Sequence, residues 1–194
     1  MNVAVFASGS GSNAENIALY FSGNEDLNVV SFLTNKPDAY IVERAKKLDI
    51  PCFFFSQNDF YNTSKVIDYL ALQKVDFIVL AGFLWLVPDS LLAAYPRKVV
   101  NIHPALLPAY GGKGMYGGKV HSAVIENGEK ESGITIHYVT GEYDKGDIIF
   151  QAKCKVEPAD TPESLAAKVH ELEYRYYPEV IERIVLDMGK EKEG

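Results

Sequence analysis

Short runs of β-branched and aromatic residues alternate with longer helical patterns along this chain, and this alternation restricts the fold more than any other feature. It is typical of βαβ units, in which helices join consecutive parallel strands. The run at residues 77–80, Phe-Ile-Val-Leu, is apolar throughout, as expected for a strand covered on both faces. The sequence therefore predicts an α/β fold with a Rossmann-like, mostly parallel, twisted sheet flanked by helices.

The expected elements follow from these runs and from the glycines and prolines between them. The expected strands cover residues 3–7, 27–33, 52–55, 77–80, 99–102, 133–139 and 148–156, the last two forming a C-terminal β-hairpin. The expected helices cover residues 13–21, 39–48, 59–73 and 120–126, with a short helix around residues 91–92. The glycine-rich segment 111–118 is expected to be a loop.

A long helix is expected to close the fold. Thr161 can accept a hydrogen bond as its N-cap, and Pro162 suits the first helical position because a missing N–H costs nothing there. Pro178 is expected to kink or interrupt this helix. Residues 189–194 read as a frayed, solvated tail. The apolar stripe expected along the helix itself consists of Leu165, Val169, Leu172, Tyr176 and Val180.

Length and charge limit the classes of protein that this chain can represent. Its 194 residues form one expected domain, and 19 basic against 26 acidic residues give a net charge of −7 without a basic run. We therefore expect no nucleic-acid partner. No apolar stretch reaches the length of a membrane span, and no signal peptide is evident, so we expect no membrane association and a cytoplasmic location. Cys52 and Cys154 are expected to be reduced thiols.

The first strand leads into Ser8-Gly9-Ser10-Gly11-Ser12-Asn13-Ala14, which opens the first helix. Free N–H groups and the helix dipole converge at such a turn, so it predicts a phosphate site. A structural alternative is a tight turn capped by Ser12. The spacing Gly9-x-Gly11-x-x-Ala14 also fits the dinucleotide fingerprint of nicotinamide-dependent dehydrogenases. That fingerprint needs an acid at the end of the second strand, where Leu33-Thr34-Asn35-Lys36 stands. A phosphate monoester is therefore favoured.

A second candidate site lies at Asn101-Ile102-His103-Pro104, at the carboxyl end of the fifth strand. Asn101 and His103 point to the same side of the strand. An amide and an imidazolium placed together can polarise a carbonyl group and supply a proton. A nearby carboxylate would hold or raise the histidine pKa. Spacing leaves Glu142, Asp144 and Asp147 open for that task.

Together these motifs resemble the folate-dependent formyltransferases over nearly the whole chain. The resemblance rests on residues 3–13, Leu80-Ala81-Gly82-Phe83, residues 101–108, Glu126-Asn127-Gly128, residues 133–139 and Asp144-Lys145-Gly146. It implies transfer of a formyl group from the co-substrate 10-formyltetrahydrofolate to the amine of 5-phosphoribosylglycinamide in de novo purine biosynthesis. It implies neither a metal nor a covalent enzyme intermediate. The fold expected from it is of the formyltransferase type.

The resemblance also assigns roles to residues. It implies that His103 is the proton donor, Asn101 the oxyanion partner and Asp144 the carboxylate that raises the histidine pKa. It implies that Gly11, Ser12 and Asn13 bind the ribonucleotide phosphate and that Glu173 meets its glycinamide end. The border position of Glu173 on the last helix independently predicts that its carboxylate has a partner. The residues implied for the folate are Leu84, Trp85, Leu86, Val87, Asn101, Thr140, Gly141, Glu142, Tyr143 and Asp144.

The domain 1–194 is accordingly expected to comprise a nucleotide-phosphate-binding half (1–100), a catalytic and folate-binding half (101–188) and the tail. Trp85 departs from the family pattern, since some relatives carry an arginine there, and residues 111–118 form a longer loop than in many. The partners expected are small-molecule substrates, with the chain a monomer or homodimer. Alternatives are a deformylase or another formyltransferase that uses the same folate, or a non-catalytic module that binds a nucleotide phosphate.

Overall fold

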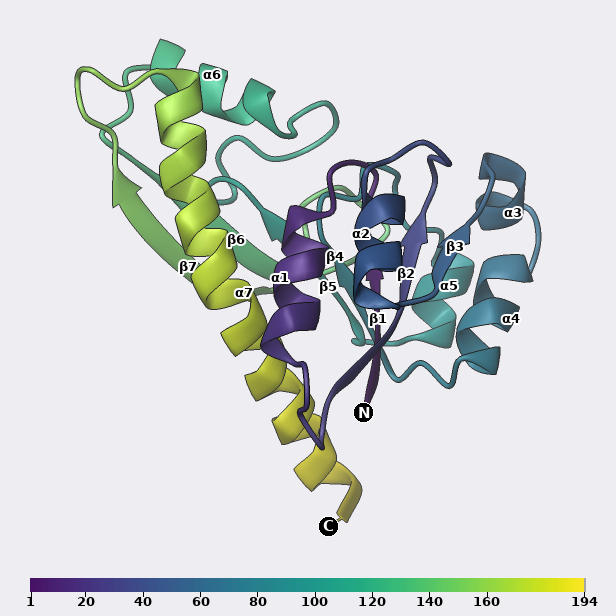
Figure 1. Ribbon diagram of the computed structural model, residues 1–194. Coiled ribbons are helices and arrows are strands. Elements are labelled where there is room, and N and C mark those ends of the chain that lie inside the picture. The colour runs from purple at the N-terminus through teal and green to yellow at the C-terminus, as the bar shows by residue number, and fades with distance from the viewer. Residues whose placement is uncertain (194) are drawn as a thin grey trace.

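The centre of the computed structural model, which describes residues 1–193 and side chains up to residue 189, is a seven-stranded sheet in the order β3-β2-β1-β4-β5-β6-β7 (Figure 1). The strands are β1 (Asn2–Phe6), β2 (Asn28–Thr34), β3 (Cys52–Phe54), β4 (Phe77–Leu80), β5 (Val99–His103), β6 (Glu131–Tyr138) and β7 (Ile148–Lys155). Strands β1 to β5 pair in parallel, whereas β6 pairs antiparallel with both β5 and β7. The predicted mostly parallel sheet and C-terminal hairpin are confirmed.

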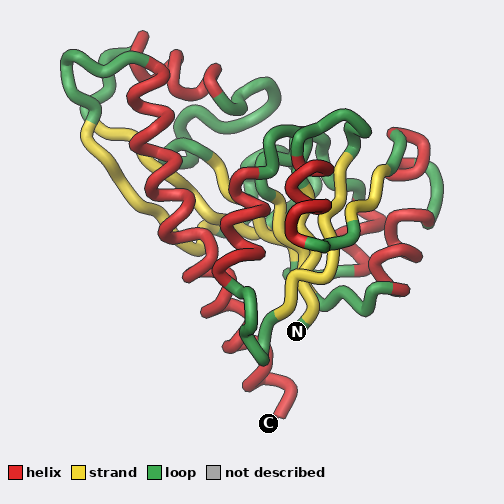
Figure 2. The backbone as a smooth tube through the Cα atoms, viewed as in Figure 1, coloured by secondary structure: helices red, strands yellow, loops and turns green. Residues whose placement is uncertain are grey.

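Helices cover both faces of the sheet, as the tube in Figure 2 also shows. The helices are α1 (Ser12–Tyr20), α2 (Ile41–Leu48), α3 (Gln57–Tyr61), α4 (Lys65–Leu72), α5 (Asp89–Ala94), α6 (Gly118–Glu126) and α7 (Pro162–Glu193). One core cluster contains buried residues of α1, α2, α6 and α7, and a second contains those of α3, α4 and α5. The sheet separates the two clusters.

Strand β1 shows how the apolar runs build this core. Val3 and Val5 belong to one cluster, and Ala4 and Phe6 belong to the other. Successive side chains of a strand point to opposite faces, so a strand buried on both sides needs apolar residues at every position. The continuous apolar runs therefore reflect a sheet between two helical layers.

The predicted helix 59–73 is wrong, because the structure divides it into α3 and α4. Ser56 caps α3 through reciprocal hydrogen bonds with Asp59, and α3 ends at Tyr61. The hydroxyl of Thr63 then accepts a hydrogen bond from the N–H of Lys65, where α4 begins. Local side-chain hydrogen bonds of this kind compete with those of a helix.

The last helix differs from the prediction in two ways. Helix α7 continues through Pro178 to Glu193, so Pro178 does not interrupt it. The tail predicted at residues 189–194 is wrong for residues 189–193, which are helical, and residue 194 lies outside the described residues. Lysine and glutamate favour helices strongly enough to prolong one. Thr161 accepts a hydrogen bond from the N–H of Ser164, so the predicted N-cap is confirmed.

The order of the strands creates a place for a ligand. The chain runs outward from β1 through β2 to β3 and then returns to the other side of β1 with β4. The loops that follow β1 and β4 therefore diverge, and ligands bind at such a switch point in open α/β sheets.

Both cysteines are unpaired. Within residues 1–193, none of the helices is both long and apolar enough to cross a membrane.

Candidate active site

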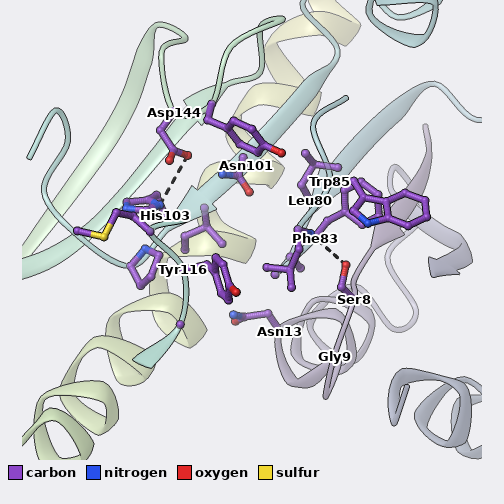
Figure 3. Close-up of a pocket in the computed structure, with 18 of the residues that line it drawn as sticks. Ser8, Gly9, Asn13, Leu80, Phe83, Trp85, Asn101, His103, Tyr116 and Asp144 are labelled. Carbon is purple, nitrogen blue, oxygen red and sulfur yellow. Dashed lines mark hydrogen bonds and ion pairs between the residues drawn. The ribbon is translucent and has the colours of Figure 1, made fainter. Parts of the chain in front are cut away.

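A cleft of about 650 Å³ lies along the carboxyl ends of β1, β4 and β5. The loop after β1 lines one part of it, the segment after β4 another, and the residues at the end of β5 a third. The glycine-rich loop, the loop after β6 and one face of α7 complete the wall. Figure 3 shows side chains from these segments converging on one space. The cleft combines residues from both predicted halves of the chain.

Gly11 shapes the phosphate-type loop. It is the N-cap of α1 with φ 69°, a left-handed conformation that favours glycine. A Cβ atom on Gly11 would lie 2.6 Å from Cβ of Ile41, so a larger residue has no room. No side chain caps this helix, which contradicts the alternative in which Ser12 caps the turn. The first N–H groups of α1 therefore open onto the cleft without a side-chain cap.

Glu173 on α7 lies against this loop. Asn13 donates a hydrogen bond from Nδ2 to Oε2 of Glu173 over 2.8 Å, and His170 Nε2 lies 3.7 Å from the same oxygen. Burial raises the pKa of Glu173, and the Asn13 hydrogen bond and the His170 ring oppose that effect. The expectation that Glu173 has a partner is met. Asn13 Oδ1 is buried without a hydrogen-bond partner among the described residues.

Asn101, His103 and Asp144 lie near one another in the cleft (Figure 3). His103 Nδ1 lies 3.6 Å from Asp144 Oδ1. Of the two other acids that spacing left open, Glu142 is exposed, and Asp147 pairs with Arg97 at 3.0 Å. The tertiary structure thus brings Asp144, and neither Glu142 nor Asp147, against the histidine.

Both ring nitrogens of His103 face hydrogen-bond acceptors. Nε2 lies 2.7 Å from the carbonyl oxygen of Tyr110, which can only accept, so Nε2 carries a hydrogen. Nδ1 faces the Asp144 carboxylate. Burial lowers the pKa of His103 below its ordinary value, although Asp144 and the Tyr110 carbonyl raise it. The expectation of a held or raised pKa is therefore wrong here, because only 4% of the residue is exposed.

Asp144 is held in a defined position by its backbone and its partners. Its φ is 56°, and its Oδ2 accepts a hydrogen bond from the N–H of Gly112 over 2.8 Å. Burial raises the pKa of Asp144, but the neighbouring His137 and His103 rings and the Gly112 N–H outweigh it, so the pKa is lowered. Asp144 is therefore ionised near neutral pH.

The part of the cleft wall formed by the segment after β4 is apolar. It contains the four residues predicted after β4: Leu84, Trp85, Leu86 and Val87. The ring of Trp85 contacts Phe60 and Tyr61, each with its centroid 6.0 Å away. The N–H of Leu84 donates to Ser8 Oγ over 3.0 Å and so ties this wall to the phosphate-type loop.

The loop after β6 meets the prediction only in part. Thr140, Glu142, Tyr143 and Asp144 line the cleft. Gly141 is exposed and is not among the lining residues. A Cβ atom on Gly141 would point at Asp89 Oδ1, 2.9 Å away, rather than into open space.

Sequence reasoning missed several residues that line the cleft. His137 is the most closely involved, because its Nε2 lies 3.1 Å from Asn101 Nδ2 and 3.6 Å from Asp144 Oδ1. The sequence alone does not place it there, because its position opposite Asn101 depends on the register of β6 against β5. Met115 and Tyr116 of the glycine-rich loop were also missed. Lys113 of that loop and His121 of α6 line the cleft too, and for these two the sequence had suggested ligand contact without a catalytic role. Among the described residues there is no cluster of three or more metal-ligating side chains.

Comparisons with known proteins identify the family of this chain. A family model described as formyl transferase matches residues 1–181. The chain is 44% identical to the chloroplastic phosphoribosylglycinamide formyltransferase of Arabidopsis thaliana, over 98% of this chain and 68% of that protein. It is 38% identical to the phosphoribosylglycinamide formyltransferase of Bacillus subtilis, over 94% of this chain and 93% of that protein. The crystal structure of phosphoribosylglycinamide formyltransferase from Bacillus halodurans matches with a TM-score of 0.85 and 38% identity, covering 95% of each chain. The chain belongs to the formyl transferase family.

Proposed function

We propose that this chain transfers a formyl group from 10-formyltetrahydrofolate to the amine of 5-phosphoribosylglycinamide, the step of de novo purine biosynthesis after which its relatives are named. One observation carries this proposal: Asn101, His103 and Asp144 line the same cleft as the phosphate-type loop and the apolar wall. A phosphorylated amine and a formyl donor with a flat ring system can thus both reach the same polar centre.

The ribonucleotide end of the cleft is the loop at the start of α1. The N–H groups at Gly11, Ser12 and Asn13 would bind the phosphate with the help of the helix dipole. Glu173, buried beside Asn13, would accept a hydrogen bond from the glycinamide amine. This arrangement explains how a chain of net charge −7 can bind a phosphate, because local N–H groups do the binding.

The folate end combines the wall of Leu84, Trp85, Leu86 and Val87 with residues of the loop after β6. We assign Thr140, Glu142, Tyr143 and Asp144 to folate contact because they line the cleft, together with Asn101. Gly141 would contribute only through the backbone of this loop. Residues 1–100 then supply the phosphate loop and the apolar wall, and residues 101–188 supply the catalytic groups and Glu173.

The chemistry assigned to this centre is a direct acyl transfer. The amine nitrogen bonds to the formyl carbon, and the bond from that carbon to N10 of the folate breaks. N10 gains a proton as it leaves, and the attacking amine loses one. Asn101 donates an N–H to the developing oxyanion. His103 donates a proton from Nδ1, because its Nε2–H is already bound to Tyr110. The Asp144 carboxylate stabilises the imidazolium form that this donation needs.

The test is to mix the protein with both substrates and to follow release of tetrahydrofolate and formation of the formylated ribonucleotide. Release of both products supports the proposal, and no release from folded protein would contradict it. Release of tetrahydrofolate and formate without the ribonucleotide would instead indicate a deformylase. Binding of the ribonucleotide without binding of the folate would indicate a non-catalytic module. The cytoplasmic location and the monomer or homodimer state stay predictions from the sequence.

A further inference from the structure

His137 is a buried histidine beside the catalytic groups, and the proposed reaction leaves it without a role. It lies on β6, where the strand register places it directly opposite Asn101 of β5. Only 2% of the residue is exposed. Its two ring nitrogens have different neighbours, and these neighbours determine which nitrogen donates and which accepts a hydrogen bond.

The first neighbour determines where the hydrogen of the ring lies. His137 Nδ1 is 2.8 Å from the carbonyl oxygen of Tyr138. A carbonyl oxygen only accepts hydrogen bonds, so Nδ1 must carry a hydrogen. In the neutral ring, Nε2 is then an unprotonated acceptor.

The second neighbour, the Asn101 side chain, donates a hydrogen bond to that Nε2 atom. Asn101 Nδ2 lies 3.1 Å from His137 Nε2, which is hydrogen-bonding distance, and Asp144 Oδ1 lies farther from the same nitrogen, at 3.6 Å. An acceptor at this position selects the N–H end of the Asn101 amide and rejects its oxygen. One N–H of Nδ2 is thereby bound to His137, and its second N–H is left for another acceptor. The orientation of an asparagine amide follows from such neighbours.

We propose that His137 is a positioning residue: its neutral ring, protonated on Nδ1, holds the Asn101 amide with an N–H directed at the formyl oxygen. This inference rests on the proposed function for its catalytic consequence. A protonated His137 would present an N–H to Asn101, and the amide would have to turn its oxygen toward the ring. The ionisable groups that face His137 are Asp144, on the loop after β6, and His103, on β5.

Two substitutions separate this role from simple packing. His137→Leu fills the site without an acceptor, and His137→Gln can place an amide oxygen where Nε2 lies. We expect His137→Leu to lower kcat by up to about a hundredfold, the cost of a misplaced catalytic group, with little change in either KM. The kcat of His137→Gln should be about tenfold higher than that of His137→Leu. A common loss in both variants with raised KM values would show that His137 only packs the site.

A double-mutant cycle with Asn101→Ala tests whether His137 acts through Asn101. In the Asn101→Ala background, His137→Leu should change kcat less than about twofold, because no amide is left to orient. The same fold-loss in both backgrounds would overturn the proposal and would point to an effect through Asp144.

A measurement that does not depend on activity completes the test. Nitrogen-15 NMR of histidine-labelled protein reports the protonation of each ring nitrogen, and the His137 signals are identified by their loss in the His137→Gln variant. We expect a protonated Nδ1 and an unprotonated Nε2 at neutral pH. A protonated Nε2 would overturn the proposal whether or not the protein transfers formyl groups. If the wild type shows the expected nitrogen signals but no turnover, the proposed function fails and the assigned geometry stands.

Discussion

Asn13 on α1 donates a hydrogen bond to Glu173 on α7 across 2.8 Å, although 160 residues separate the two along the chain. The bond joins the phosphate-type loop to the buried face of the last helix. Asn13 satisfies part of the hydrogen-bonding capacity of Glu173. Under the proposed function, this bond would couple phosphate binding at α1 to amine binding at α7.

Glu173→Gln should separate stability from substrate binding. The variant keeps an oxygen that accepts from Asn13 but removes the buried charge. Because burial raises the pKa of Glu173, the folded protein holds this proton more tightly than the unfolded chain, and stability falls as pH rises above the unfolded pKa. We expect the variant to match the wild type in acid and to exceed its free energy of unfolding at neutral pH. Urea unfolding across this pH range measures the difference.

The same substitution should weaken ribonucleotide binding. A hydrogen bond to a charged group contributes about 1.5–3 kcal/mol, so the KM for the ribonucleotide should rise at least about tenfold while that for the folate changes little. An unchanged ribonucleotide KM would show that Glu173 meets no substrate amine.

His103→Ala should abolish turnover without removing substrate binding. Loss of a general acid costs about 10²- to 10⁴-fold in rate. His103 lies at the end of β5, apart from the phosphate-type loop (Figure 3), so the Kd of the ribonucleotide by calorimetry should stay within about twofold. A parallel loss of binding would assign His103 a structural role.

Asp144→Asn should shift the pH profile of kcat. Burial lowers the pKa of His103, and Asp144 raises it in opposition, so removing the carboxylate lowers that pKa further. An acid catalyst is lost as pH rises through its pKa, so the alkaline fall of kcat should move to lower pH in the variant. Asp147→Asn, on the same loop but paired with Arg97, is the control and should keep the wild-type profile. An unshifted profile in Asp144→Asn would contradict the coupling.

Gly11→Ala should destabilise the fold, whereas Gly9→Ala should not. Gly11 has φ 69°, and an added Cβ would lie 2.6 Å from Cβ of Ile41. Strain and overpacking together should cost about 2–4 kcal/mol of unfolding free energy. An added Cβ on Gly9 would meet no atom within 4 Å, so its cost should stay within about 0.5 kcal/mol. Equal effects in urea unfolding would refute this account of the loop.

Trp85→Leu should weaken binding of the folate and leave binding of the ribonucleotide unchanged. Trp85 lines the apolar wall, and its ring also packs on Phe60 and Tyr61. We expect the KM for the folate to rise about tenfold, the equivalent of about 1.4 kcal/mol of lost apolar contact. The ribonucleotide Kd serves as the internal control. A change in both constants would mean that Trp85 supports the whole cleft.

The parts of the fold that could be predicted are those in which neighbouring residues carry the signal. Strand β4 was predicted with its observed bounds because every side chain of Phe77–Leu80 is buried. The cap at Thr161 also depends on adjacent residues. The break after Tyr61 was missed because neither glycine nor proline marks it, although the polar run Asn62-Thr63-Ser64 stands there.

The candidate site was predictable in its residue types and less so in its contacts. Asn101 and His103 could be paired from their spacing on one strand. His137 could have been paired with Asn101 only with knowledge that β5 and β6 are antiparallel and in this register. The direction in which the pKa of His103 is shifted could not be predicted. Burial of the ring lowers this pKa and the charge of Asp144 raises it, and only the tertiary structure decides which effect is larger.

The sequence by itself determined the succession of strands and helices along most of the chain, the phosphate-type turn into α1 and the start of α7. Short-range sterics and hydrogen bonds decide these features. Only the tertiary structure decided that Asp144 meets His103, that His137 meets Asn101 and that Glu173 meets Asn13. Each of these pairs joins elements that are distant along the chain. Their distances depend on sheet order, strand register and helix packing, which are cooperative properties of the whole core.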